Sequence, residues 1–409
     1  MSRKLKVLHF ADAHIDMANW GRHDPQTGLP VRVMDFLHSL DRIVDAAIDG
    51  GVDLVLFAGD AYKDRNPQPT FQREWGRRIM RLAEAEIPTV LLVGNHDVAP
   101  ALGRAHTMQE FRTLNVPYIH IADDFLALDP ADLGIPVKIL AIPWVSRSKM
   151  MRREAVAGKT TTEIFTQMED ILRDWMDDQL AKASDEPRIL LAHASVEGAK
   201  YGTERMVMLG QEMVLSGGMV RDSRLDYVAL GHIHKHQSLN GDRHPPAVYP
   251  GSIERIDFGE AGDKKGYVLA EVGRGETTWE FVPLPTRPFY DLSVEVSSAD
   301  QFMAEVMAQL PAGEKVAGAM VRVRLTYPYD WEALVDEQAI YAHLSPAFNV
   351  QIQKNRQVSR RARLGDTAGV ESLSHEELLN IYWQTIDLDT EETEAMQGLA
   401  RDLFAQMKE

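Results

Sequence analysis

Short apolar runs alternate with amphipathic segments along the first part of the chain. The apolar runs predict strands over residues 5–10, 54–58, 89–93, 137–142, 188–192 and 227–230. Between these runs, hydrophobic residues recur at helical spacing from Val33 to Ala47 and again from Phe71 to Leu82. This alternation of strands and helices predicts an α/β fold with a layered core.

The pattern becomes strand-rich after Gly231, with runs at residues 247–249, 266–271 and 277–282. Three prolines between residues 282 and 289 then indicate a domain boundary. We therefore expect a first domain over residues 1–284 and a small α+β domain over residues 285–355. In the second domain, strands are expected at residues 292–296, 321–325 and 348–352, and helices at residues 299–310 and 331–343.

Residues 356–409 are expected to form a basic linker followed by two amphipathic helices. Their apolar stripes run over residues 378–386 and 396–407. Such stripes are typical of helices that dock a partner, and equally of helices that pack on their own domain.

Charge and cysteine content narrow the chemistry. The chain of 409 residues carries a net charge of −17, which argues against nonspecific electrostatic coating of DNA. A nucleic-acid substrate would therefore need a local basic surface, a metal ion or a partner. Without cysteines, any metal must bind His, Asp, Glu or Asn. We find no signal segment and no apolar run long enough to span a bilayer, and expect a cytoplasmic protein with no membrane contact.

Side chains that bind hard or borderline metal ions follow five of the predicted strands. Ligands bind at this edge of an α/β sheet, where strands end and the chain turns. In the motifs D-x-H and H-x-H, residues two apart on an extended chain point the same way and can face one ion. The candidate ligands are Asp12, His14, Asp60, Asn95, His193, His232 and His234.

Seven ligands suit two ions about 3.5–4 Å apart, bridged by one carboxylate. Asp60 is the natural bridge, because it is the only ligand in its motif. Asp12, His14 and His234 would then complete one ion, and Asn95, His193 and His232 the other. Alone, D-x-H, G-D or a histidine after a strand is more often a turn or a satisfied core or surface group. G-N-H-D after an apolar strand is a much stronger signal, G-H-x-H adds to it, and the joint occurrence of all five favours the metal interpretation.

The order D-x-H, G-D, G-N-H-D, H, G-H-x-H resembles the calcineurin-like metallophosphoesterase superfamily. The resemblance implies a layered β-sandwich core flanked by helices, and two divalent ions that activate water for attack on a phosphate. It also implies that His96 contacts the scissile phosphate and protonates the leaving oxygen. The superfamily includes phosphatases, cyclic-nucleotide phosphodiesterases, nucleotidases and nucleases, so the core alone does not fix the substrate.

Residues 249–260, YPGSIERIDFGE, resemble an element of the SbcD-type DNA double-strand-break nucleases. This resemblance implies the nuclease subunit of an SbcCD-like repair complex, with double-strand exonuclease and single-strand or hairpin endonuclease activity. It implies that residues 285–355 cap DNA and that residues 356–409 dock an SbcC-like ATPase. Manganese is the favoured ion, with Mg²⁺, Fe²⁺ and Zn²⁺ open, and a homodimer within a heterotetramer is expected. Without the resemblance, the segment is a strand and turn beneath the metal site.

The sequence departs from that pattern at Lys63, where many members carry a histidine linked to exonuclease activity. A lysine can contact phosphate but shuttles protons less readily near neutral pH, so strand polarity and the balance of exonuclease and endonuclease activity are not predicted. The best candidate DNA contacts are Arg147, Lys149, Arg152, Arg153 and Lys159. The helical spacing of Arg73, Arg77, Arg78 and Arg81 favours a solvated face, and residues 360–363 can contact DNA or solvate a linker.

Two other functions compete with the nuclease. A phosphomonoesterase or cyclic-nucleotide phosphodiesterase could use the same core, although the long extension after Pro285 counts against it. A scaffold with a degenerate site could serve mainly to anchor an ATPase, although the intact ligand set counts against that.

Overall fold

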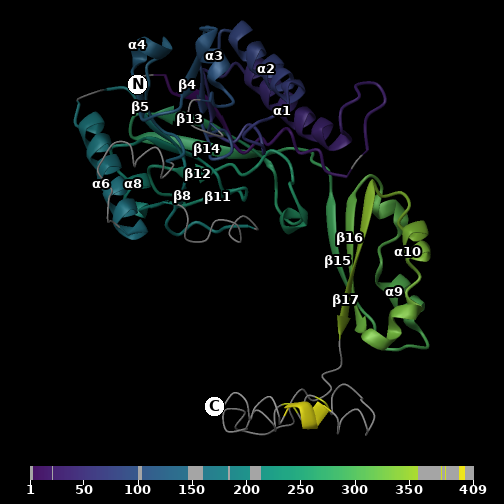
Figure 1. Ribbon diagram of the computed structural model, residues 1–409. Coiled ribbons are helices and arrows are strands. Elements are labelled where there is room, and N and C mark those ends of the chain that lie inside the picture. Colours follow the sequence, from purple (N-terminus) through teal and green to yellow (C-terminus); the bar gives the residue numbers. More distant parts are fainter. Residues whose placement is uncertain are drawn as a thin grey trace. The chain divides into compact units, whose positions relative to one another are not determined.

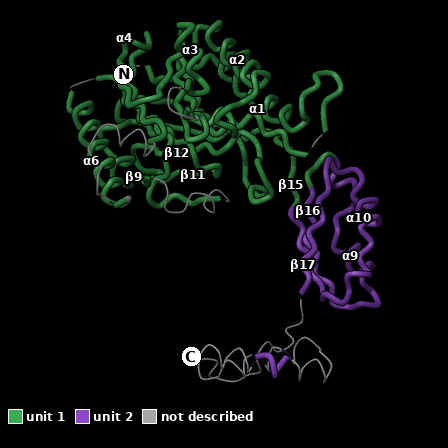
Figure 2. Tube along the Cα trace, in the orientation of Figure 1, with its two compact units in different colours: residues 1–290, 318–320 green, residues 291–317, 321–409 purple. Residues whose placement is uncertain are grey.

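A computed structural model describes residues 3–20, 22–99, 104–145, 160–182, 185–202 and 213–357, together with residues 379, 383 and 396–400. The chain forms two compact units (Figure 2). The first comprises residues 1–290 and 318–320, and the second comprises residues 291–317 and 321–409. Apart from these few C-terminal residues, the predicted C-terminal helices lie outside the described residues.

Two six-stranded sheets build the first unit. The order of the first sheet is β14 (Glu276–Pro283), β13 (Gly266–Gly273), β1 (Leu5–Phe10), β2 (Leu54–Phe57), β3 (Thr89–Leu92) and β4 (Ile119–Ala122). The order of the second is β11 (Gln237–Ser238), β12 (Ala247–Tyr249), β10 (Tyr227–Gly231), β7 (Arg188–His193), β6 (Lys138–Ile142) and β5 (Leu126–Leu128). Strands β1 to β4 are parallel, as are β12, β10, β7 and β6, whereas the remaining edge strands are antiparallel.

The two sheets stack between two helical layers. Figure 1 shows α1 (Val31–Asp49) and α2 (Pro69–Glu84) on one side of the sheets, and α6 (Thr161–Leu180) with α8 (Gly217–Val220) on the other. Shorter segments complete the unit: α3 (Gln109–Thr113), α4 (Pro130–Leu133), η1 (Phe258–Glu260) and the strand pair β8 (Ser195–Val196) and β9 (Val214–Leu215). The predicted layered α/β core is confirmed.

Strand β1 shows why the central strands read as continuous apolar runs. Leu8 and Phe10 belong to the cluster that packs under α1 and α2, whereas Leu5 and Val7 belong to the cluster shared with the second sheet. A third cluster joins the second sheet to α6 and α8. Because successive side chains point to opposite faces, a strand covered on both faces needs apolar residues at every position.

The second unit is a three-stranded sheet with short helices. Its strands are β15 (Phe289–Glu295), β16 (Met320–Pro328) and β17 (Asn349–Gln357), and its helical segments are α9 (Phe302–Gln309), η2 (Gly313–Val316), η3 (Tyr329–Leu334) and α10 (Glu337–His343). The prediction of one helix over residues 331–343 is wrong. A 3₁₀ segment ends at Leu334, and Asp336 caps a new helix by accepting a hydrogen bond from the Ala339 amide.

Residues 284–288 stay attached to the first unit. The Leu284 amide donates to the Lys265 carbonyl, and Arg255 donates to the Arg287 carbonyl. The Arg287 guanidinium makes a two-point ion pair with Asp35 on α1, with N–O distances of 2.6 and 2.7 Å. The first unit therefore includes residues 285–290, which the proline pattern placed after the boundary.

Candidate metal centre

The seven candidate ligands come together at the carboxyl ends of five strands. Strands β1, β2 and β3 of the first sheet lead to Asp12 and His14, to Asp60 and to Asn95. Strands β7 and β10 of the second sheet lead to His193 and to His232 and His234. The centre therefore lies where the ends of both sheets meet, and all seven candidate ligands are buried.

The backbone at the centre adopts conformations that side chains usually avoid. Four ligands have positive φ angles: Asp12 (50°), His14 (39°), Asp60 (64°) and His232 (100°). Such conformations cost free energy in non-glycine residues and persist where the surrounding structure fixes them, often at functional sites. They turn the ligands inward as each strand ends.

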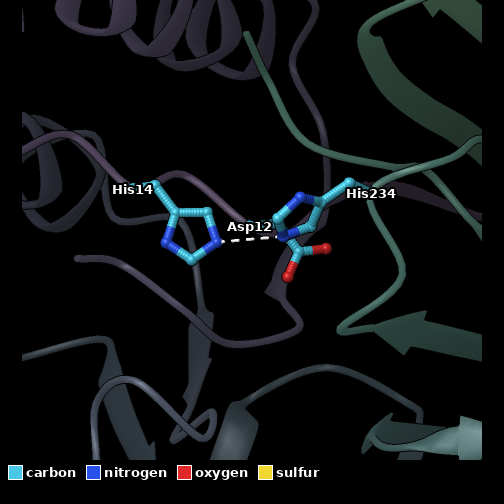
Figure 3. A group of neighbouring side chains, drawn as sticks. All are labelled: Asp12, His14 and His234. Atoms are coloured by element: carbon cyan, nitrogen blue, oxygen red, sulfur yellow. Dashed lines mark hydrogen bonds between the residues drawn. The ribbon is translucent and has the colours of Figure 1, made fainter. Parts of the chain in front are cut away.

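One group of ligands consists of Asp12, His14 and His234 (Figure 3). The Nε2 atoms of the two histidines lie 3.2 Å apart. The Nδ1 atom of His14 lies 3.1 Å from the Tyr62 carbonyl, and that of His234 lies 2.9 Å from Glu260 Oε1. Both Nδ1 atoms face acceptors and therefore carry the hydrogen, so in the neutral rings the two Nε2 lone pairs face one another. A shared cation satisfies this arrangement.

The second group consists of Asp60, His193 and His232, with Asn95 beside them. His193 Nδ1 lies 2.6 Å from the Ala58 carbonyl and donates to it. Its Nε2 atom faces two oxygens, Asn95 Oδ1 at 2.9 Å and Asp60 Oδ2 at 3.4 Å, to which a protonated ring donates and which a metal ion could bind together with the deprotonated nitrogen. Carboxylate and amide oxygens and imidazole nitrogens are the ligand atoms that a hard or borderline metal ion prefers, so the residues present fit an ion here too.

Asp60 lies between the two groups. Its Oδ2 is 3.4 Å from His193 Nε2 and 3.8 Å from His14 Nε2, and its Oδ1 accepts from the His96 amide at 2.8 Å. This is the position that the bridge assignment requires.

Burial and charge shape the electrostatics. Burial lowers the pKa of His14 well below its usual value, which favours the neutral imidazole that binds metals. Burial raises the pKa of Asp12, whereas the histidines around Asp60 outweigh burial and hold its pKa well below the usual value. Burial opposes the charged form of His193, but the Asp60 carboxylate raises the pKa of His193 to about 9.

Sequence reasoning missed three residues that hold or adjoin the ligands. Asp97, the last residue of G-N-H-D, accepts from the amides of Asp60, Ala61 and Gly94 at 2.7–3.0 Å and so joins the two ligand loops. Burial raises the pKa of Asp97 to about 7. Its place in the motif was the available signal.

The other two residues lie far from their partners in sequence. Glu260 forms a hydrogen bond with His234. Burial raises the pKa of Glu260, but this bond and the Lys265 ammonium outweigh burial and lower the pKa to about 2. The Trp144 ring lies 5.0 Å from the His232 ring, between centroids. The sequence signal for Glu260 was its place at the end of residues 249–260. No sequence pattern pointed to Trp144.

His96 lies beside the ligands rather than among them. Its Nδ1 donates to the Lys63 carbonyl at 2.7 Å, and the Lys63 ammonium lies 3.5 Å from its Nε2. Both side chains line a cavity of about 1040 Å³ that extends toward Asp16, Asn19 and His23. Burial lowers the pKa of His96, and the Asp60 carboxylate opposes this shift.

Only one of the predicted basic clusters, the arginines of α2, lies in the described part of the chain. On α2, Arg73, Arg77 and Arg78 form ion pairs with Glu74, and Arg78 and Arg81 pair with Asp41. Residues 147–159 and 360–363 lie outside the described residues. In the described residues, no helix is both long and apolar enough to cross a membrane.

Comparison with known proteins gives three findings. Residues 5–236 match the family model described as calcineurin-like phosphoesterase. The uncharacterized metallophosphoesterase YhaO of Bacillus subtilis is 27% identical over 310 residues, which cover 74% of this chain. The match covers 66% of the length of YhaO, just under two thirds.

The solved structures that match this chain share little of its sequence. The protein TT1561 of Thermus thermophilus has a TM-score of 0.40 and 15% identity, with 68% of this chain and 99% of that chain covered. A dimetal phosphatase from Danio rerio has a TM-score of 0.42 and 13% identity, with 69% and 97% covered. Purple acid phosphatase PPD1 from yellow lupin has a TM-score of 0.41 and 12% identity, with 69% and 52% covered.

Proposed function

We propose that this chain, which belongs to the calcineurin-like phosphoesterase family of two-metal phosphoester hydrolases, acts on DNA. In this proposal it is the nuclease subunit of an SbcCD-like repair complex and cleaves DNA phosphodiesters as exonuclease and endonuclease. Manganese is the proposed ion, and the proposed location is the cytoplasm.

One observation carries the choice of substrate. Residues 249–260, which resemble the SbcD-type element, supply Glu260, the carboxylate hydrogen-bonded to ligand His234. The segment that resembles the SbcD-type element therefore contacts a ligand of the metal centre. Its resemblance bears on the chemistry of the site as well as on the fold.

The space beside His96 is consistent with a large substrate. Ligand pockets typically enclose about 300–1,000 Å³, and the cavity of about 1040 Å³ is slightly larger than that range. Lys63 and Arg65 line it, and among the described residues neither forms an ion pair. Cationic side chains in such positions can contact the phosphates of a strand.

The residues divide the chemical work as follows. When bound, two divalent ions would polarise the phosphate oxygens and lower the pKa of the attacking water. The His96 ring, fixed by its Nδ1–H bond to the Lys63 carbonyl, lines the cavity and leaves Nε2 for proton transfer. Protonated there, Nε2 donates its proton to the leaving oxygen.

The partner proposal rests on the sequence alone. We propose that the C-terminal region after residue 356 docks an SbcC-like ATPase, in a heterotetramer built on a homodimer of this chain. When the residues after Gly365 are deleted, we expect the chain to lose co-purification with the ATPase and to keep its ion content unchanged. Undiminished co-purification would contradict it.

Cleavage assays test the substrate. The purified chain with Mn²⁺ is incubated with linear duplex DNA, hairpin DNA, 3′,5′-cyclic AMP and the monoester p-nitrophenyl phosphate. Metal-dependent cleavage of DNA, lost in Asp60→Asn, is the expected result. Hydrolysis of the monoester or the cyclic nucleotide alone would replace the nuclease with the corresponding phosphatase or phosphodiesterase, and no hydrolysis of any substrate would favour a scaffold.

A further inference from the structure

The ligand histidines differ in the hydrogen-bond partner of the ring nitrogen that faces away from the ion position. His14 and His193 direct Nδ1 to the backbone carbonyls of Tyr62 and Ala58. His234 instead directs Nδ1 to the carboxylate of Glu260, at 2.9 Å. A carboxylate behind a ligand histidine fixes the ring and its tautomer, and makes the metal-binding nitrogen more basic than a carbonyl does.

Glu260 is itself held by a buried network. Its Oε2 accepts from the Ile256 amide at 2.9 Å and lies 2.9 Å from the Lys265 ammonium. Lys265 also donates to the His234 carbonyl at 3.0 Å and to Ser252 Oγ at 2.8 Å. Glu260 and Lys265 are each 1% exposed. The ammonium thus joins the carboxylate and the backbone of the histidine that the carboxylate orients.

A fully buried ion pair needs a reason, because desolvation of two charges offsets much of their attraction. Here the Lys265 ammonium contacts both the Glu260 carboxylate and the backbone of His234. Lys265 also neutralises Glu260, so the pair adds no net charge to the centre. The effect of the pair on a bound ion therefore acts through the position and basicity of His234.

The two ion positions also differ in charge. The position formed by Asp12, His14 and His234 has a carboxylate of its own besides the shared Asp60. The other position has the neutral Asn95 amide where the first has Asp12. Divalent cations bind more tightly where more anionic ligands face them.

We propose that Glu260, held by Lys265, is a positioning residue that makes the Asp12–His14–His234 position the tighter of the two ion sites, so that the ions bind in order. This inference uses the two-ion chemistry of the proposed function but is independent of its DNA substrate.

Ion binding tests the proposal without any substrate. The full-length chain is stripped of metal and titrated with Mn²⁺, with free Mn²⁺ measured by electron paramagnetic resonance. The unmodified chain is expected to bind two ions in two separate steps. Glu260→Gln keeps the size of the side chain but removes the carboxylate, and should weaken the tighter step by about 10–100-fold.

Glu254→Gln is the matched control. Glu254 lies in the same segment and is also 1% exposed, and it accepts from the Arg255 and Arg287 amides. Among the described residues, its carboxylate bonds to neither a ligand histidine nor Lys265, so both Mn²⁺ steps should keep the affinities of the unmodified chain. Equal weakening in Glu254→Gln and Glu260→Gln would overturn the proposal.

A double variant separates ion binding from folding. If Glu260→Gln fails to fold because Lys265 loses its partner, Glu260→Gln with Lys265→Met removes both buried charges. The double variant should fold and show the same weak first step. Unchanged two-step binding in either variant would overturn the proposal. Failure of the unmodified chain to cleave DNA would refute the proposed substrate while leaving this result intact.

Discussion

At the scale of single residues, the centre is a set of acceptors that face one another. The 3.2 Å approach of the Nε2 atoms of neutral His14 and His234 rings is unfavourable without a cation between them. The positive φ angles of Asp12 and Asp60 add backbone strain. These residues are arranged for bound ions at a cost to the stability of the metal-free chain.

Asp60→Asn should remove both ions, because the bridging carboxylate faces a ligand histidine of each group. The amide keeps the size of the side chain and can still accept from the His96 amide. Elemental analysis after dialysis should find two ions per chain in the unmodified protein and fewer than one in Asp60→Asn. Asp226→Asn, which alters another fully buried carboxylate away from the centre, should retain both. Two ions in Asp60→Asn would disprove the bridge.

His96→Ala should retain both ions but slow DNA cleavage by about 10²–10⁴-fold, the usual contribution of a general acid. Bis(p-nitrophenyl) phosphate has a leaving group that departs without protonation, so its hydrolysis should fall much less. Comparison of the two turnover rates distinguishes proton donation from phosphate positioning. Equal losses on both substrates would exclude the acid role.

Lys63 shows why a side-chain substitution near a site can leave its geometry intact. The group that holds His96 Nδ1 is the backbone carbonyl of Lys63, which any residue supplies. The lysine side chain instead places its ammonium 3.5 Å from His96 Nε2. The lysine side chain therefore changes the charge beside His96 without changing what orients the ring.

At the scale of elements, the loops after β2 and β3 fit together closely. A Cβ atom on Gly94 would lie 2.2 Å from Asp60 Oδ1 and 2.6 Å from the Asp60 nitrogen. Asp97 bridges the same loops through the Asp60 and Gly94 amides. The glycine of G-N-H-D is thus required by the approach of a neighbouring loop, and the aspartate of that motif by the amides it holds.

Gly94→Ala should lower the free energy of unfolding of the first unit by about 1–3 kcal/mol, because the added methyl overlaps Asp60. Gly76→Ala is the control, since α2 leaves nothing within 4 Å of a Cβ there. Replacing a helix-interior glycine should raise the same free energy by about 0.5–1 kcal/mol. Urea titrations with a chelator present keep ion loss from contributing. An unchanged free energy of unfolding in Gly94→Ala would show that the two loops can separate.

At the scale of the whole molecule, the ion ligands join the two sheets. Asp12, Asp60 and Asn95 follow strands of the first sheet, whereas His193 ends β7 and His234 follows β10, both in the second sheet. An ion bound at either position therefore links the two halves of the first unit. Its binding free energy adds to the stability of the folded chain.

Mn²⁺ should raise the thermal unfolding midpoint of the first unit, and a chelator should lower it. Free ion at about 100 times its dissociation constant stabilises the fold by about 2.7 kcal/mol per site. Differential scanning calorimetry across a range of free Mn²⁺ measures the shift. The midpoint of Asp60→Asn should be insensitive to the ion. A chelator-insensitive midpoint in the unmodified chain would contradict ligation at this centre.

The sequence by itself determined the layered α/β core and the identity of the residues gathered at the strand ends. Both follow from local patterns, because strand periodicity and the turn after each strand are written in neighbouring residues. It did not determine the break between η3 and α10, because an apolar stripe outweighed the local capping signal of Asp336.

Only the tertiary structure decided how the ligands are held. Asp60 faces His14, which lies far before it in sequence, and His193, which lies far after it. Glu260 reaches His234 across 26 residues, and the His232 amide reaches Asp12 across 220. These contacts depend on how the two sheets stack and where their strand ends meet. No window of sequence contains that information, since it arises from packing between distant segments.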